Sequence, residues 1–178
     1  MSGDLDEETT NHREAVYRAF ADRSRDPETA AERALEVGAE RLGVEVGFLT
    51  RIDDGIQTIV RSVGDHALIQ PGETCPLDRA YCRRTVEIDG LLSVQDAAAS
   101  EQVTEAAYDT FELGTYIGGK VVVDGEVYGT LCFADERPRD EAFSESDELF
   151  VELVARLVGQ AVERESHERA LREQNERL

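Results

Sequence analysis

Basic residues are scarce in this sequence: Lys120 is the only lysine, and 19 lysines and arginines stand against 39 aspartates and glutamates, for a formal charge of −20. The few cations form no cluster, and this argues against direct binding to nucleic acid, because phosphate contacts need grouped lysines and arginines. The acidic residues are spread along the whole chain. We interpret them as the surface of a protein adapted to concentrated salt, where the Debye length shortens to about 3 Å at 1 M. The alternative is an acidic surface evolved for a basic partner.

Long apolar runs are also missing. Nothing approaches the roughly 20 apolar residues that a transmembrane helix requires, and the segment Met1 to Asp6 has neither the basic patch nor the apolar stretch of a secretory signal. We therefore expect a cytoplasmic protein with no membrane partner. At 178 residues, of which 40% are hydrophobic, the chain fits one domain with helical extensions.

Cysteines are few and odd in number, which argues against a framework of structural disulfides and favours reduced thiols. Six residues separate Cys75 from Cys82, and Cys132 lies far downstream. A zinc site usually needs a tight cysteine pair and a fourth ligand, and the three histidines are distant in sequence. We therefore predict no metal site. The histidines are His12, His66 and His167.

Hydrophobic periodicity and turn residues predict an alternation of helices and strands. Helices are expected over 8–21 and 28–42, the second beginning near Pro27 and ending at Gly43. Strand pairs joined by Asp-Gly turns are expected over 44–52 with 56–63 and over 115–123 with 126–134. Between these pairs we expect a loop over 64–76, short helices over 77–86 and 103–111, and a short strand over 91–94.

A long helix is expected from Ser144, which can form a capping box with Asp147. Its first half carries a wide apolar face suited to packing on a sheet. Beyond Glu163 a partial seven-residue spacing continues, which predicts a helical linker that pairs with a second copy; the alternative is a frayed polar tail. The seam positions are Phe150, Leu157, Arg164, Leu171 and Leu178, with Val154, Ala161, Glu168 and Asn175 between them.

Six segments carry a resemblance to a known family. They are Pro71 to Leu77 followed by Tyr81 to Thr85, Leu91 to Ala97, and the run from Leu113 to Lys120 with Val127 to Phe133 and Phe143 to Leu149. Together they resemble the middle and the end of GAF domains over about residues 27–164. The sequences of these segments are most similar to the GAF modules of haloarchaeal sensor histidine kinases and of regulators related to the bacterio-opsin activator.

The resemblance implies an α+β fold: an antiparallel sheet of five or six strands, with the N- and C-terminal helices on one face and short helices covering a ligand cavity on the other. It divides the chain into an N-terminal helix over 1–26 that contacts a second copy, a GAF domain over 27–164 and a signalling linker over 163–178. The positions that match the family cavity are Tyr81, Cys82, Asp96, Tyr116, Gly118, Thr130 and Cys132. The residues themselves leave other roles open, since a buried tyrosine can be satisfied by a carbonyl, Asp96 can cap a helical turn, and the adjacent glycines 118 and 119 can mark a bulge.

The predicted function is that of a sensory domain, not itself an enzyme, which binds an unidentified small molecule, forms a homodimer and acts on a downstream kinase or transcription-output domain. No cofactor can be named. Two enzyme or chromophore alternatives come from the same family: a reductase of free methionine sulfoxide that uses Cys75 and Cys82, and a covalent bilin carrier. The first lacks its recognisable acidic motif and the second its Cys-His pair. A third alternative is a ligand-free dimerisation spacer, which predicts a cavity filled by the protein's own side chains.

Overall fold

One antiparallel sheet organises the molecule in this computed structural model, which describes residues 2–22, 24–88 and 90–176. The strands lie in the order β3-β2-β1-β6-β5-β4, so the predicted sheet has six strands. They are β1 (Val46–Asp53), β2 (Ile56–Val63), β3 (Thr74–Pro76), β4 (Leu92–Val94), β5 (Thr115–Val123) and β6 (Glu126–Asp135). The helices are α1 (Ser2–Ala21), α2 (Pro27–Leu42), α3 (Cys82–Glu87), α4 (Glu105–Phe111) and α5 (Glu145–Glu176), with 3₁₀ turns η1 (Leu77–Arg79) and η2 (Ala97–Ala99).

The two hairpins confirm the turn predictions. Asp54-Gly55 joins β1 to β2 and Asp124-Gly125 joins β5 to β6, and all four residues have positive φ, between 52° and 80°. This is the geometry of the tight turns whose twist matches that of the flanking strands. The pair β5 and β6 continues in register from Thr115 opposite Asp135 until an irregularity between Val121 and Val122. The strand β3, which pairs with β2 along the sheet edge, was expected to be loop.

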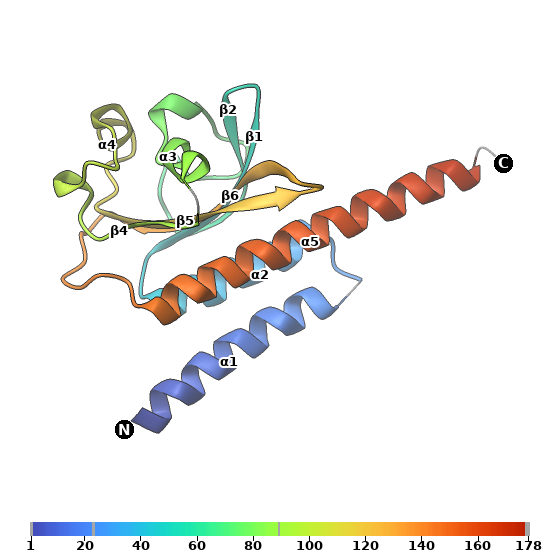
Figure 1. Ribbon diagram of the computed structural model, residues 1–178, viewed down its shortest axis with the longest axis horizontal. Coiled ribbons are helices and arrows are strands. Elements are labelled where there is room, and N and C mark those ends of the chain that lie inside the picture. The colour runs from blue at the N-terminus through green and yellow to red at the C-terminus, as the bar shows by residue number, and fades with distance from the viewer. Residues whose placement is uncertain (1, 23, 89, 177–178) are drawn as a thin grey trace.

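Helices cover one face of the sheet (Figure 1). Both α2 and α5 pack directly on the sheet, and α1 packs on α2 and α5. Asp26 caps α2 by accepting from the Thr29 N–H at 2.7 Å, and Gly43 ends it with φ 67°. The predicted capping box of α5 is present: Asp147 N–H donates to the Ser144 hydroxyl oxygen at 3.1 Å, and Ser144 N–H donates to Asp147 Oδ2 at 3.2 Å. The core on this side, which we call the helix-side core, includes Leu35, Ile117, Leu131, Phe133, Val151 and Val154.

The opposite face carries α3, α4 and the loops around them (Figure 1). Its core, which we call the α3-side core, includes Phe48, Ile69, Tyr81, Leu113, Tyr116 and Cys132. Alternation along β5 and β6 separates the two cores, because successive strand residues point to opposite faces. Among the described helices, none is long and apolar enough to cross a membrane.

The heptad seam of α5 is used differently along its length. Its first members, Phe150, Val154, Leu157 and Ala161, belong to or pack against the helix-side core, so they are not available to a second copy. Residues 166–176 are exposed, and Leu171 is the one large apolar side chain there, 60% exposed. Leu178, the last predicted seam position, lies outside the described residues. The exposed seam is thus shorter than the sequence pattern suggested.

Candidate functional site

The positions that the resemblance assigned to the cavity meet in the α3-side core. Of the seven predicted residues, Tyr81, Cys82, Tyr116, Gly118, Thr130 and Cys132 come together there, from α3 and its preceding residue and from the facing strands β5 and β6. That these residues bind a ligand stays a prediction; what the structure shows is that six of the seven lie together in the α3-side core. Asp96 is the exception.

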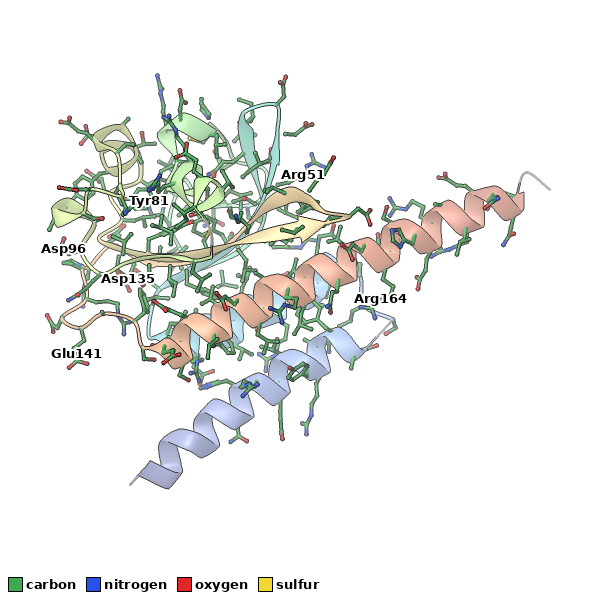
Figure 2. The ribbon with its side chains drawn as sticks, viewed as in Figure 1. Arg51, Tyr81, Asp96, Asp135, Glu141 and Arg164 are labelled. Atoms are coloured by element: carbon green, nitrogen blue, oxygen red, sulfur yellow. The ribbon has the colours of Figure 1, made fainter. Side chains whose placement is uncertain are left out.

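Asp96 lies apart from the others, exposed at the outer edge of the molecule beyond β4 (Figure 2). Its carboxylate accepts a hydrogen bond from the Ala98 N–H at 3.2 Å and so caps the 3₁₀ turn η2. Asp96 thus has the capping role that the sequence left open, and the structure does not bring it together with the other six predicted residues.

A buried network of hydroxyl and thiol groups occupies the centre of the α3-side core. We call it the thiol cluster, formed by Thr50, Cys82, Thr85, Tyr116, Thr130 and Cys132, all of them at most 1% exposed. The sulfurs of Cys82 and Cys132 lie 3.8 Å apart. The Tyr116 hydroxyl is 2.9 Å from the Cys132 sulfur and 2.8 Å from the Thr85 hydroxyl oxygen.

The rest of the thiol cluster is satisfied by threonines. The Thr130 hydroxyl donates to the Cys82 sulfur at 3.0 Å, and the hydroxyl oxygens of Thr130 and Thr50 lie 2.7 Å apart. Buried polar groups are costly unless they are paired in this way. Thr50 and Thr85 were not among the predicted site residues. Thr85 had a signal, since it follows Cys82 by three residues and so shares its face of α3.

Electrostatics make the two cysteines unequal. The hydrogen bond with Cys132, supported by Thr130 and Tyr116, lowers the pKa of Cys82 against the opposing effect of burial. Burial, together with the neighbouring Cys82, raises the pKa of Cys132 well above its ordinary value. Burial likewise raises the pKa of Tyr116, so its hydroxyl stays protonated.

Gly118 makes room for a side chain of this protein. A Cβ built there would lie 2.5 Å from the Tyr116 hydroxyl oxygen and 3.0 Å from the Cys132 sulfur. The neighbouring Gly119 points to the other face, where a Cβ would lie 2.7 Å from Leu91 Cδ2. The sheet stays in register at both glycines, and its irregularity falls between Val121 and Val122, so neither glycine marks a bulge.

The space left inside this core is small. A cavity of about 10 Å³ lies beside Cys82, lined also by Gln57, Tyr81, Phe111 and Leu113. A cavity of this size is at the lower limit for holding a single water. The Gln57 side-chain oxygen is buried and has no hydrogen-bond partner among the described residues. Gln57, a polar residue on the inward-facing side of β2, was not among the predicted site residues.

A larger groove lies outside the cavity, with Tyr81 between the two. It has a volume of about 380 Å³ and runs between α3 and residues 101–104, with Ala80 and Tyr81 in its wall. Tyr81 also lines the small cavity, and its hydroxyl donates to the Leu113 carbonyl at 2.7 Å. The predicted tyrosine–carbonyl contact is thus present, and Tyr81 separates the groove from the thiol cluster.

The groove is polar. Arg83, Arg84, Glu87 and Glu101 line it, and the Arg84 Nε–H donates to the Gln102 side-chain oxygen at 2.6 Å.

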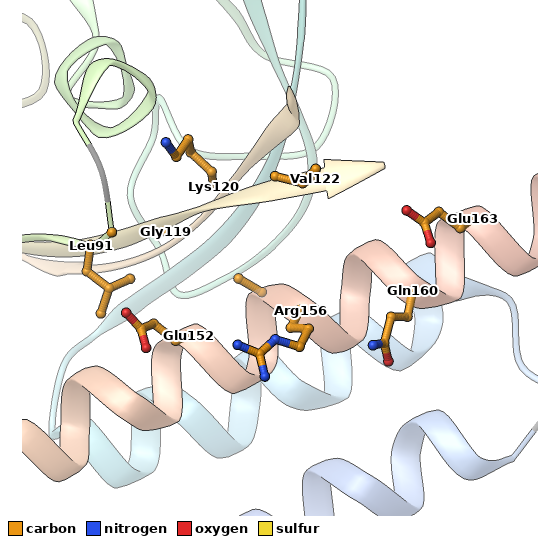
Figure 3. A pocket seen from close by; sticks show the side chains of 10 residues that line it. Leu91, Gly119, Lys120, Val122, Glu152, Arg156, Gln160 and Glu163 are labelled. Atoms are coloured by element: carbon orange, nitrogen blue, oxygen red, sulfur yellow. The ribbon is translucent and has the colours of Figure 1, made fainter. Parts of the chain in front are cut away.

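A second groove of about 480 Å³ lies on the other face of the sheet, between the edge of β5 and α5 (Figure 3). There the ammonium group of Lys120 donates to the Ile88 carbonyl at 2.8 Å and Glu163 accepts from the Asp124 N–H at 2.7 Å. None of the seven predicted residues lines this second groove.

The remaining cysteine lies at the sheet edge. Cys75 belongs to β3 and is half-buried, and its thiol donates to the Pro76 carbonyl at 3.3 Å. Burial raises the pKa of Cys75. No group of three or more possible metal ligands occurs among the described residues.

Comparison with known proteins identifies the class of protein. The sequence matches the GAF domain family over residues 26–162, and the chain belongs to that family. No curated protein matches the sequence closely enough to extend this assignment.

Solved structures share the fold at low sequence identity. The GAF domain of an Acinetobacter phosphoenolpyruvate-protein phosphotransferase has a TM-score of 0.72 at 14% identity, covering 92% of this chain and 96% of that one. A phycocyanobilin-bound GAF domain from a cyanobacterial phytochrome has 0.73 at 14%, covering 88% and 96%. The free methionine-R-sulfoxide reductase of Neisseria meningitidis has 0.67 at 17%, covering 89% and 93%. At this level of identity the likeness shows the fold, which this chain shares with GAF domains of a phytochrome and of a phosphotransferase.

Proposed function

We propose that this chain is the sensory GAF domain of a cytoplasmic signal-transduction protein, a sensor histidine kinase of the haloarchaeal type, and that it relays the state of its α3-side core through α5. The observation that carries the proposal is the division of α5. Phe150, Val151, Val154 and Val158 are buried against the rest of the domain, whereas residues 166–176 are exposed on the same continuous helix. Figure 2 places Arg164 where α5 leaves the domain.

The strand β5 supplies the connection between core and helix. Tyr116 points into the thiol cluster, while its neighbour Ile117 lies in the helix-side core. On the α5 side, a Cβ at Gly119 would lie 3.7 Å from the Ala155 Cβ. A shift of β5 that accommodates a change at Tyr116 therefore also changes the packing of α5 on the sheet, because packed interiors transmit strain.

A polar small molecule in the groove between α3 and residues 101–104 is the proposed input. The groove volume of about 380 Å³ falls in the usual range for ligand sites, roughly 300 to 1,000 Å³. Its arginines and glutamates favour a polar or charged ligand. A ligand that turns Tyr81 outward breaks its hydrogen bond to Leu113 and opens the core to the groove.

The output side of the proposal is a homodimer and a kinase or transcription-output domain that follows α5. In the exposed half, Arg169 and Arg172 pair with Glu165 and Glu168 one turn earlier, which supports the helix itself. Leu171 is the apolar side chain available for a second copy. We propose no catalysis by this domain, and no contact with nucleic acid or membrane.

Native mass spectrometry and sedimentation of the protein, purified from a salt-adapted host and kept in molar salt, test this function. We expect a dimer that carries a discrete small-molecule mass. Leu171→Glu should weaken the dimer, whereas Leu149→Glu is the matched control, because Leu149 is equally exposed, at 58% against 60%, but lies on the half of α5 that packs on the domain. A monomer at every concentration, or equal weakening by both variants, would contradict the relay through the exposed half.

A ligand-free dimerisation spacer is the second candidate. The observation that favours it is the filled core, where only about 10 Å³ remains beside Cys82. Spacer and sensor differ in the same native mass spectrum, since a spacer yields an empty dimer that no metabolite extract stabilises against heat.

The reductase alternative rests on the likeness to the Neisseria meningitidis enzyme and on the paired cysteines. The closed core and the raised pKa of Cys75 weigh against it. Incubation with free methionine-R-sulfoxide and a thiol reductant decides the point: turnover that is lost in Cys82→Ser would establish the enzyme in place of the sensor.

A further inference from the structure

The paired thiols of the α3-side core have a chemistry that the sensor proposal does not use. Cys82 and Cys132 come from opposite sides of this core, α3 and β6, and their sulfurs are already in contact at 3.8 Å. We propose that Cys82 and Cys132 are a redox modification site, which hydrogen peroxide converts to an intramolecular disulfide that ties α3 to β6. This inference concerns the cysteines alone and stands whether or not the domain binds a ligand.

The geometry leaves little to be moved. A disulfide has a sulfur–sulfur length of about 2.05 Å, so the two sulfurs must approach by roughly 1.8 Å. Cys82 opens α3, a six-residue helix, whereas Cys132 is held in the middle of the sheet by pairing on both sides, opposite Phe48 and Gly118. The short helix is therefore the part that moves toward the sheet.

The surroundings distinguish the attacking thiol from the resolving one. The Thr130 hydroxyl donates to the Cys82 sulfur at 3.0 Å, and the Cys132 thiol at 3.8 Å is a second donor to a thiolate at Cys82, whereas the Tyr116 hydroxyl lies nearer to Cys132. The pKa of Cys132 is raised by burial, which keeps that thiol protonated. Because Cys82 lines the small cavity and Cys132 does not, we assign Cys82 as the nucleophile and Cys132 as the resolving thiol.

The small cavity gives the oxidant a place beside Cys82. Cys82 is one of its walls, and its volume of about 10 Å³ is at the lower limit for one water, so hydrogen peroxide, with two oxygens, enters when the cavity expands. The unpartnered side-chain oxygen of Gln57, only 3% exposed, lies in the same wall and can accept a hydrogen bond from a peroxide O–H. Tyr81 separates this cavity from the outer groove, which supplies the route from solvent.

The reaction balances as two steps. The Cys82 thiolate attacks one peroxide oxygen, the O–O bond breaks, and the second oxygen leaves as water with the thiol proton, giving a sulfenic acid at Cys82. The Cys132 sulfur then attacks the Cys82 sulfur, the S–O bond breaks, and the oxygen leaves as water with the Cys132 proton. Two thiols lose two electrons and one peroxide becomes two waters.

Peroxide treatment of the full chain in molar salt, followed by denaturation, alkylation and peptide mapping, tests the inference. We expect wild type and the control Cys75→Ser to lose about 2 Da, the two thiol hydrogens, and to yield a Cys82–Cys132 cross-linked peptide that a dithiol reverses. Both proteins retain the pair and its packing, so this readout does not depend on variants of the core. Both cysteines recovered as alkylated thiols, or a cross-link through Cys75, would overturn the proposal.

The order of attack has its own test. Cys132→Ser should trap a sulfenic acid at Cys82 that reacts with dimedone, whereas Cys82→Ser should leave Cys132 unlabelled. The reverse pattern overturns the assignment of Cys82 as nucleophile.

Discussion

Gly118 lies in the middle of β5 beneath the ring of Tyr116, and a Gly118→Ala variant measures how firmly the α3-side core is filled. The new methyl carbon would lie 2.5 Å from the tyrosine hydroxyl oxygen, 2.8 Å from its Cζ and 3.0 Å from the Cys132 sulfur. Tyr116 and Cys132 are fully buried, so neither can retreat into solvent. The ring must therefore shift, and its hydroxyl must leave Thr85 or Cys132.

Three contributions set the magnitude. Overpacking a well-filled core costs roughly 1 to 3 kcal/mol. Each neutral hydrogen bond that is lost costs about 1 kcal/mol more, and the Tyr116 hydroxyl makes two short ones, at 2.8 and 2.9 Å. Replacing a strand glycine with alanine returns about 0.5 to 1 kcal/mol. With one of these two bonds lost, we therefore expect Gly118→Ala to lower the free energy of unfolding by about 1 to 3.5 kcal/mol.

Urea unfolding, followed by circular dichroism at constant high salt, is the appropriate assay, because guanidinium would change the ionic strength. The matched background is Tyr116→Phe, which removes the oxygen nearest to the new methyl group, so the cost of Gly118→Ala should be smaller there. A loss below about 0.5 kcal/mol, as at an ordinary surface site, would refute the filled core. An equal cost in both backgrounds would show that the tyrosine hydroxyl is not the obstacle.

Three other substitutions test the framework around the site. By helix propensity alone, Gly38→Ala in α2 would raise the free energy of unfolding by about 1 kcal/mol. We expect it instead to lower that free energy in urea unfolding, because the new Cβ would overlap the buried Phe133 ring. A gain in stability would contradict this packing. Ser144→Ala removes the capping-box hydroxyl of α5 and should cost about 1 kcal/mol of unfolding free energy, with exposed Ser166→Ala on the same helix as control. Asp26→Asn tests a pH effect: the hydrogen bond from Thr29 lowers the folded-state pKa of Asp26, so its carboxylate stabilises above the unfolded pKa of about 3.9. The excess stability of wild type over Asp26→Asn should accordingly vanish as the pH falls through the folded-state pKa, and a difference that persists in acid would refute the cap.

Most elements of the fold could be predicted from short-range signals in the sequence. Two Asp-Gly turns placed the strands that they connect, Gly43 ended α2, and the reciprocal bonds of Ser144 and Asp147 began α5. Each of these signals depends on a few neighbouring residues, which is why it can be recognised in a single sequence. The strand β3 could not, because three residues at a sheet edge have no periodicity and owe their conformation to pairing with β2.

The site was harder, because it depends on contacts between segments far apart. The family resemblance placed Cys82, Tyr116 and Cys132 in one region, but their mutual distances come from the stacking of α3 on the sheet. Asp96 has a side chain able to bind a ligand, yet its position one residue before a 3₁₀ turn decides its use as a cap. Gln57 could not be identified as part of the site from sequence at all, since a polar residue in an alternating strand usually faces solvent.

The filled core and the proposed sensory role are compatible if the state that is sensed is the packing itself. The sulfurs, hydroxyls and Tyr116 ring fill the space over β5, so any event that displaces one of them, whether a rotation of Tyr81 or a bond between the sulfurs, must displace the others. On the reverse side of the same strand, Ile117 and Gly119 lie against the helix-side core and α5. Glycines at 118 and 119 allow close approach from both faces, and this closeness couples the two cores. It follows that a side chain added at Gly118 should disturb the thiol cluster first, whereas one added at Gly119 should disturb Leu91 and α5 first.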